Sequence, residues 1–180
     1  VEGDFYINND PFEGGQHLQD VFLFSPIFVD GTLVGFGATV AHHLDLGGGA
    51  PGLNPDATDV HQEGLIFPPS KYNMEHDWNG GPLERLIRAN IRVPDQTIGD
   101  FNAQFAANSV GGHRVMDLCG RFGVDAVIEA MEKLLDYSER RMRAAIRDLP
   151  DGIYEGEDFL DDDGITDEPL RVHATVEIKG

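Results

Sequence analysis

The stretch Val21-Phe22-Leu23-Phe24, followed by Asp30-Gly31 and then by Leu33-Val34-Gly35-Phe36, decides how the first part of this 180-residue chain folds. Two apolar runs on either side of an Asp-Gly pair predict two antiparallel strands joined by a tight turn, because this pair readily adopts the backbone angles of a two-residue hairpin. Pro26 has no backbone N–H to donate. We therefore expect the first strand to lie at a sheet edge or to carry a bulge near Pro26.

The far ends of these two strands must lie side by side, and side chains that bind metals stand there. His17 and Asp20 are at the start of the first strand, and His42 and His43 are at the end of the second. Imidazole nitrogen and carboxylate oxygen together suit Zn, Mn or Fe(II), with positions left for water or substrate. The sequence predicts a divalent metal site at the open end of the hairpin. The competing interpretation is that the histidines only satisfy the backbone of a loop.

The register of the hairpin decides which histidine faces the carboxylate. In a regular hairpin Asp20 shares a face with Ala41 and His43, whereas His42 shares a face with Gln19. A bulge near Pro26, or a strand that ends before Asp20, turns His42 toward the carboxylate instead. The residues by themselves leave both histidines open.

The rest of the first region is rich in glycine and proline. Residues 1–70 are expected to form strands and loops, and the glycines and prolines between Leu46 and Pro69 predict one long loop. Loops of this length in compact domains are commonly functional or disordered, and the apolar residues embedded in this one favour an ordered, packed loop.

Helices and then strands are predicted for the remaining residues. Helical periodicity covers 82–149, in segments that start at Pro82, span roughly 97–118 and run from about Val124 to Leu149, the last being the longest. Residues 153–180 return to strands, and in 171–178 polar and apolar residues alternate as in a half-buried strand. We expect an α+β fold that forms a single unit over 1–180.

Composition excludes several classes of partner. The chain has 32 acidic and 13 basic residues, which gives a formal charge of −19. A surface this negative repels nucleic-acid backbones and anionic membranes. No apolar run reaches the roughly 20 residues of a membrane span, and the N-terminal residues show no secretory signal pattern. A cytoplasmic location is the expectation.

Four motifs, in this order along the chain, resemble the hydantoinase B family. They are residues 3–20 (GDFYINNDPFEGGQHLQD), 41–48 (AHHLDLGG), 62–65 (QEGL) and 135–143 (LDYSERRMR). The family includes B subunits of N-methylhydantoinase, the matching half of 5-oxoprolinase, and subunits of acetone and acetophenone carboxylases. The resemblance covers nearly all 180 residues. Family members are much longer, so it implies that this chain is an internal piece of a larger fold.

The resemblance also implies a divalent metal and a partner subunit. The metal-binding pattern of the family falls on His17, Asp20 and His42, which selects His42 over His43 by analogy, and a further carboxylate ligand is expected upstream of Val1. The partner is an A-type subunit that binds ATP, with Mg, and phosphorylates a carbonyl oxygen or the carboxylating species. Residues 72–81 depart from the common family pattern, and we assign them no role.

The resemblance implies that the subunit takes part in the ATP-dependent opening of a cyclic amide, such as a hydantoin, 5-oxoproline or a lactam. Asp45 or Glu63 is a candidate for the general base or for a residue that orients a ligand, although either could simply bond a loop. The first alternative is a ketone carboxylase subunit, which uses the same ligands. The second, from another class, is a non-catalytic assembly module whose histidines are structural.

Overall fold

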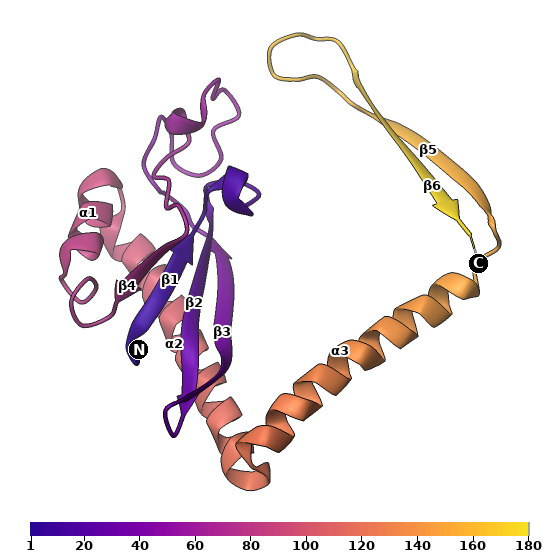
Figure 1. Ribbon diagram of the computed structural model, residues 1–180. Helices are drawn as coiled ribbons and strands as arrows, with labels where there is room; N and C mark the ends of the chain where they lie inside the picture. Colours follow the sequence, from indigo (N-terminus) through magenta and orange to yellow (C-terminus); the bar gives the residue numbers. More distant parts are fainter. Residues whose placement is uncertain (180) are drawn as a thin grey trace. The chain divides into compact units, whose positions relative to one another are not determined.

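A four-stranded antiparallel sheet organises the first part of the computed structural model, which describes residues 1–179 (Figure 1). The strand order is β3-β2-β1-β4. The bounds of these strands are Asp4–Asn8 for β1, Asp20–Val29 for β2, Thr32–His42 for β3 and Ser70–Asn73 for β4. The hairpin predicted around Asp30-Gly31 is β2–β3, and both turn residues have positive φ angles, 49° and 78°, as the tight turn requires.

A bulge next to Pro26 sets the register of the hairpin. Close to the turn Phe28 pairs with Leu33, but Ile27 already pairs with Gly35, so Val34 is an extra residue in β3. The irregularity expected near Pro26 is present between Ile27 and Phe28, but the extra residue belongs to β3 rather than to the first strand, where the bulge was expected. β2 is an inner strand, yet β1 pairs with it only at Phe22, Leu23 and Phe24, so Pro26 has a strand on one side alone. Beyond the bulge every partner is displaced by one residue from the regular register.

Two helices, α1 (Pro82–Asn90) and α2 (Pro94–Phe122), supply the rest of the core of the first part. Odd-numbered residues of β1 and β2 are buried with them, and the sheet face with even numbers is more exposed. Figure 1 shows α2 running along the sheet. The buried cluster consists of Phe5, Ile7, Val21, Leu23, Leu46, Phe67, Trp78, Leu83, Ile87, Ile91, Ile98 and Phe101.

The expectation that the helix near Val124–Leu149 is the longest was wrong. α2 has 29 residues, whereas α3 (Val124–Arg147) has 24. Four glycines, among them Gly112, weaken the helical pattern of α2 in the sequence. Side-chain amides on α2 compensate by anchoring the helix to β2: Gln104 donates to the carbonyl of Val21 at 2.9 Å. Hydrogen bonds between distant parts of the chain cannot be predicted from the helical periodicity of the sequence.

The described chain divides into two compact units, Val1–Ala126 and the residues from Val127 onward, and the division falls in the first turn of α3. The second unit contains most of α3 and a hairpin of β5 (Gly152–Leu160) and β6 (Leu170–Ile178). Alternation predicted β6 correctly as a strand, but Val172 and Val176 are 52% and 55% exposed. The expected half-burial of this strand is therefore not present in residues 1–179.

These elements give an α+β architecture, as predicted. Among residues 1–179, the helices are all too short or too polar to cross a membrane. The even-numbered face of the sheet carries a row of aromatic side chains. Phe22 stacks near Phe24 with ring centroids 6.5 Å apart, and Tyr6 meets Phe36 edge to face at 6.1 Å.

Candidate metal centre

The structure brings His17, Asp20 and His42 together at the open end of the hairpin. Asp20 pairs directly with His42 across β2 and β3. The imidazole Nε2 of His17 lies 3.5 Å from the carboxylate Oδ2 of Asp20. The rings of His17 and His42 meet edge to face with centroids 5.1 Å apart. Because the bulge at Val34 displaces the register, His42 rather than His43 is opposite Asp20.

A short ordered turn presents His17. The side chain of Asp10 accepts a hydrogen bond from the backbone of Phe12 and begins the 3-10 helix η1 (Pro11–Glu13). Gly15 closes this turn by donating to the carbonyl of Asp10 at 2.9 Å. The backbone of Asp20 then donates to the carbonyl of His17 at 3.1 Å, which folds the two predicted ligands toward each other.

His43 points away from this cluster and into the core. It is fully buried, its ring stacks on Phe101 at 4.1 Å, and its Nε2 is 2.9 Å from Oε1 of Gln104. Since the amide nitrogen of Gln104 donates to Val21, its oxygen faces the histidine, which must donate from Nε2. Burial lowers the pKa of His43 from 6.5 and keeps the ring neutral. His43 is a core histidine in this structure.

Asp45 is buried and holds the start of the long loop. Its carboxylate accepts hydrogen bonds from the backbone of Gly47 and from the backbone and side chain of Arg92, with the guanidinium Nη1 at 2.9 Å. Burial by itself raises the pKa of Asp45, but the hydrogen bonds and the charge of Arg92 outweigh it and hold the pKa below 3.8. Its proposed catalytic role stays a prediction, and its surroundings favour the loop-bonding alternative.

Glu63 ends the short 3-10 helix η2 (Val60–Gln62) near the other end of the loop. Its side chain is half-buried and its carboxylate accepts no hydrogen bond from residues 1–179. The backbone carbonyl of Glu63 accepts a hydrogen bond from Nε2 of Gln19 at 3.3 Å, and Gln19 directly precedes Asp20 in the sequence. A catalytic role for Glu63 also stays a prediction, and the structure leaves its carboxylate available.

The predicted long loop is compact because its glycines allow two parts of its backbone to come into contact. Gly48 has φ of +72°, and a Cβ on it would lie 2.4 Å from the carbonyl oxygen of Gln62. Only glycine fits such an approach. The backbone of Leu65 also donates to the carbonyl of Leu46 at 2.8 Å. The loop is therefore ordered, as the embedded apolar residues predicted.

The three side chains fit a divalent ion as part of a donor set. Nδ1 of His17 is buried and has no hydrogen-bond partner among residues 1–179, so one imidazole nitrogen is free to donate electrons. No group of three His, Cys, Asp or Glu side chains in the described chain has the spacing of a finished metal site. His17, Asp20 and His42 lie near one another, and their role as metal ligands stays a prediction.

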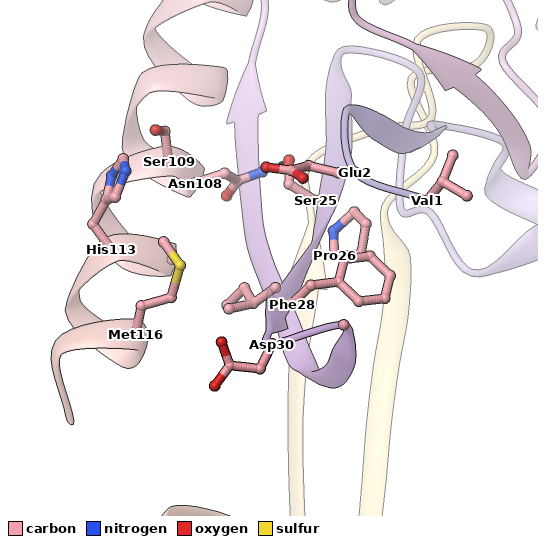
Figure 2. A pocket seen from close by; sticks show the side chains of 13 residues that line it. Val1, Glu2, Ser25, Pro26, Phe28, Asp30, Asn108, Ser109, His113 and Met116 are labelled. Atoms are coloured by element: carbon pink, nitrogen blue, oxygen red, sulfur yellow. Dashed lines mark hydrogen bonds between the residues drawn. The ribbon is translucent and has the colours of Figure 1, made fainter. Parts of the chain in front are cut away.

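Two cavities differ in their relation to this cluster. One, of about 490 Å³, lies between the turn end of the hairpin and α2, and its lining includes Met116 of α2 and Pro26 and Asp30 of the hairpin (Figure 2). None of the predicted site residues lines it. Another, of about 590 Å³, lies on the sheet face that carries Asp20 and His42. Its lining residues are Tyr6, Ile7, Asn8, Glu13, Phe24, Phe36, Pro69 and Ser70.

Sequence reasoning missed three residues that organise this region. Arg92 contacts Asp45 across 47 positions of sequence, and no local pattern links the two. Asn9 and Gln19 lie inside the first motif, and their buried amides bond backbone at positions far along the chain. A buried Asn or Gln has no pattern of its own in one sequence, so its burial had to come from the tertiary structure.

Comparisons with known proteins agree with this fold. The caprolactamase subunit beta of Pseudomonas jessenii is 39% identical over 185 residues, which is all of this chain and 31% of the relative. The crystal structure of the ATP-dependent caprolactamase from the same species superimposes with a TM-score of 0.87 at 38% identity, over the whole chain and 31% of its own. The acetophenone carboxylase delta subunit of Aromatoleum aromaticum is 29% identical over 99% of the chain and 26% of the relative.

The chain thus spans about 31% of the length of the caprolactamase relatives and forms part of a larger fold. The caprolactamase and acetophenone carboxylase relatives are both named as subunits. A family model described as Hydantoinase B/oxoprolinase matches residues 1–180. The chain belongs to the hydantoinase B/oxoprolinase family.

Proposed function

We propose that this chain is the metal-binding part of a B-type subunit of an ATP-dependent cyclic amide hydrolase. The observation that supports the proposal best is that His17, Asp20 and His42 lie close together at the open end of the β2–β3 hairpin. Two imidazoles and one carboxylate suit Mn, Zn or Fe(II). The similarity to an ATP-dependent caprolactamase favours a cyclic amide as the substrate.

An amide carbonyl is a poor electrophile, and this explains the need for ATP. We propose that a partner A-type subunit binds ATP with Mg and transfers the γ-phosphoryl group to the amide oxygen. Water then adds to the activated carbon, the ring C–N bond breaks to give the free amine, and a second water releases phosphate as the carboxylate forms. A divalent ion, when bound, supplies a nucleophile near neutral pH by lowering the pKa of its water.

Residues of this chain have separate parts in the proposal. His17, Asp20 and His42 hold the ion. Glu63 is proposed as the base or the orienting carboxylate, because nothing among residues 1–179 occupies its oxygens. Asp45 fixes the loop between them through Arg92. The location consistent with ATP and a partner subunit is the cytoplasm.

A second candidate is a ketone carboxylase subunit. The observation that favours it is the acetophenone carboxylase relative, which aligns with 99% of the chain. The same three ligands would then hold a metal ion that binds an activated ketone or its enolate. The two reactions differ in their second substrate, so assays with a cyclic amide and with a ketone plus bicarbonate separate them.

The test uses the full-length subunit assembled with its A-type partner. His17→Ala, Asp20→Ala and His42→Ala should each lower turnover by more than the roughly 10–100-fold that loss of a residue orienting a ligand costs, and metal content should fall in parallel. His61→Ala is the matched control, because His61 is an exposed histidine of η2 outside the cluster. Its metal content and turnover should equal those of the unmodified complex.

Each outcome has a distinct meaning. Metal retained in all three variants would remove the ligand assignment, and full turnover in His17→Ala would favour the assembly module. ATP hydrolysis that depends on a cyclic amide, without incorporation of bicarbonate, supports the amidase. Incorporation of bicarbonate into a ketone supports the carboxylase instead.

A further inference from the structure

Gln19 links the segment of the predicted ligands to the long loop. Its side chain is 1% exposed, and Nε2 donates to the carbonyls of Gly52 at 2.9 Å and Glu63 at 3.3 Å. Those two carbonyls lie in different parts of the loop, and Gln19 itself is between the predicted ligands His17 and Asp20 in the sequence. Its own carbonyl accepts from the backbone of His43 at 2.8 Å, beside His42. Gln19 therefore connects the His17–Asp20 segment, the long loop and the residues at the end of β3.

Asn9 makes a second link of the same kind. It is fully buried, and its Nδ2 donates to the carbonyl of Leu18 at 2.7 Å and to that of Leu65 at 2.9 Å. Its Oδ1 accepts from the backbone of Phe67 at 2.6 Å. Leu18 lies between His17 and Gln19, so the amide of Asn9 joins the ligand segment to the last part of the loop.

Besides stabilising the fold, these hydrogen bonds fix the positions of the segments that they connect. A buried amide that bonds two carbonyls removes two unsatisfied acceptors and fixes the distance between the chains that carry them. Asp20 is the first residue of β2, whereas His17 lies on the turn before it, so the sheet ladder alone does not fix His17. A ligand set performs well only when its residues are held within a fraction of an ångström of the required geometry.

We propose that Asn9 and Gln19 are positioning residues of the candidate metal centre, whose buried amides couple the His17–Asp20 segment to the Leu46–Pro69 loop. The proposal rests on the proposed function for the identity of the site. The amides act through backbone carbonyls, so they touch neither the ion nor the substrate. Loss of their donors should loosen the segment and the loop together.

The experiment compares isosteric variants in the full-length subunit. Asn9→Asp and Gln19→Glu keep the shape of each side chain but replace the donor nitrogen by oxygen. Asn108→Asp is the matched control, because Asn108 is 4% exposed and its Nδ2 donates to the carbonyl of Leu23 at 3.2 Å and to the hydroxyl of Ser25 at 3.3 Å. That amide ties α2 to the sheet, away from the His17–Asp20 turn.

Three properties are measured on every variant. The dissociation constant of Mn²⁺ should rise by about 10–100-fold in Asn9→Asp and Gln19→Glu and stay unchanged in Asn108→Asp. Hydrogen exchange should become faster in 17–20 and in 46–69 together for the first two variants, but not for the control. The thermal midpoint should fall in all three, because each loses a buried hydrogen bond.

Equal Mn²⁺ affinity in all variants with unchanged exchange in 17–20 would overturn the proposal. An equal loss of affinity in Asn108→Asp would also overturn it, because general destabilisation would then explain the result. If the unmodified subunit bound no Mn²⁺, the metal assignment in the proposed function would fail. The exchange comparison would still decide whether the two amides couple the turn to the loop.

Discussion

Two buried titratable side chains lie beside the predicted ligands, and each is held by a different kind of partner. The imidazole of His43 is stacked in the core against Phe101, while the carboxylate of Asp45 is paired with Arg92. Neither side chain belongs to the cluster of His17, Asp20 and His42. They differ in the charge that they can carry, but the pKa of each is lowered in the folded state, so acid weakens the contribution of both to stability, that of His43 below pH 6.5 and that of Asp45 below pH 3.8.

Asp45 and Arg92 should be energetically coupled. Asp45→Asn and Arg92→Gln should each lower the free energy of unfolding by about 1–3 kcal/mol, because each removes a hydrogen bond to a charged group. The double variant should lose less than the sum, which chemical denaturation of all four proteins measures. The pair Glu139–Arg143, 2.7 Å apart and exposed on α3, is the control, with coupling of at most about 0.5 kcal/mol.

The same variants test the catalytic alternative for Asp45. If Asp45 only anchors the loop, turnover of the assembled complex should fall to the same degree in Asp45→Asn and Arg92→Gln. A base at Asp45 would instead make Asp45→Asn far more damaging than Arg92→Gln. That second result would contradict the loop-anchoring assignment.

His43 should make the protein less stable in mild acid. Its pKa in the folded state is below 6.5, so the unfolded chain binds more protons once the pH falls under about 6.5. The free energy of unfolding should then decrease by up to about 1.4 kcal/mol for each further pH unit, down to the pKa of the folded state. Urea unfolding at several pH values measures this slope.

His43→Gln removes the titrating ring and should flatten the part of the slope that His43 causes. His61→Gln, in which an exposed histidine of η2 is changed, should keep the slope of the unmodified protein. An unchanged slope in His43→Gln would show that other groups cause the acid sensitivity.

At the scale of elements, the bulge in β3 decides which side chains meet. Deleting Val34 should remove the bulge and leave the pairs from Ile27–Gly35 to Asp20–His42 in one regular ladder, because Val34 is the residue of β3 without a partner. Metal affinity should therefore be retained in the deletion variant, and its loss would show that the site depends on the bulge itself rather than on the Asp20–His42 pair. Val34→Ala keeps the register and should retain the metal, as elemental analysis of both purified proteins would show.

Close packing of α2 on β3 makes a second test at this scale. A Cβ on Gly37 would lie 3.0 Å from the backbone oxygen of Asn108, whereas a Cβ on Gly35 meets nothing within 4 Å. Gly37→Ala should therefore lower the free energy of unfolding by about 1–3 kcal/mol, because the helix backbone must move. Gly35→Ala should change it by no more than about 0.5 kcal/mol. Denaturation of the two variants would contradict this packing if their stabilities matched.

At the scale of the whole molecule, the core and the candidate site both belong to the first unit, Val1–Ala126. The second unit has an amphipathic helix and a two-stranded hairpin, and a hairpin of two strands is marginal by itself in water. Such elements are normally stabilised by further packing. This agrees with the 31% share of the caprolactamase structure that the chain matches. The charge of −19 covers both units and is a property of the surface rather than of the site.

The sequence by itself determined the elements and their approximate order. Asp30-Gly31 predicted the hairpin, periodicity predicted the helices, and the hairpin then brought His17 and Asp20 to the residues that end β3. These predictions succeeded because each depends on neighbours within a few positions, where backbone preference and side-chain alternation act. The motifs also identified the family, and their order along the chain made that identification specific.

Only the tertiary structure decided which side chains share a face and which are buried. One extra residue in β3 selected His42 over His43, the partner of Asp45 came from 47 residues away, and the length of α2 depended on amides that reach β2. Register, ion pairing and burial each depend on the sum of many weak contacts between distant residues. No stretch of a single chain contains that sum, so it exists only once the chain has folded.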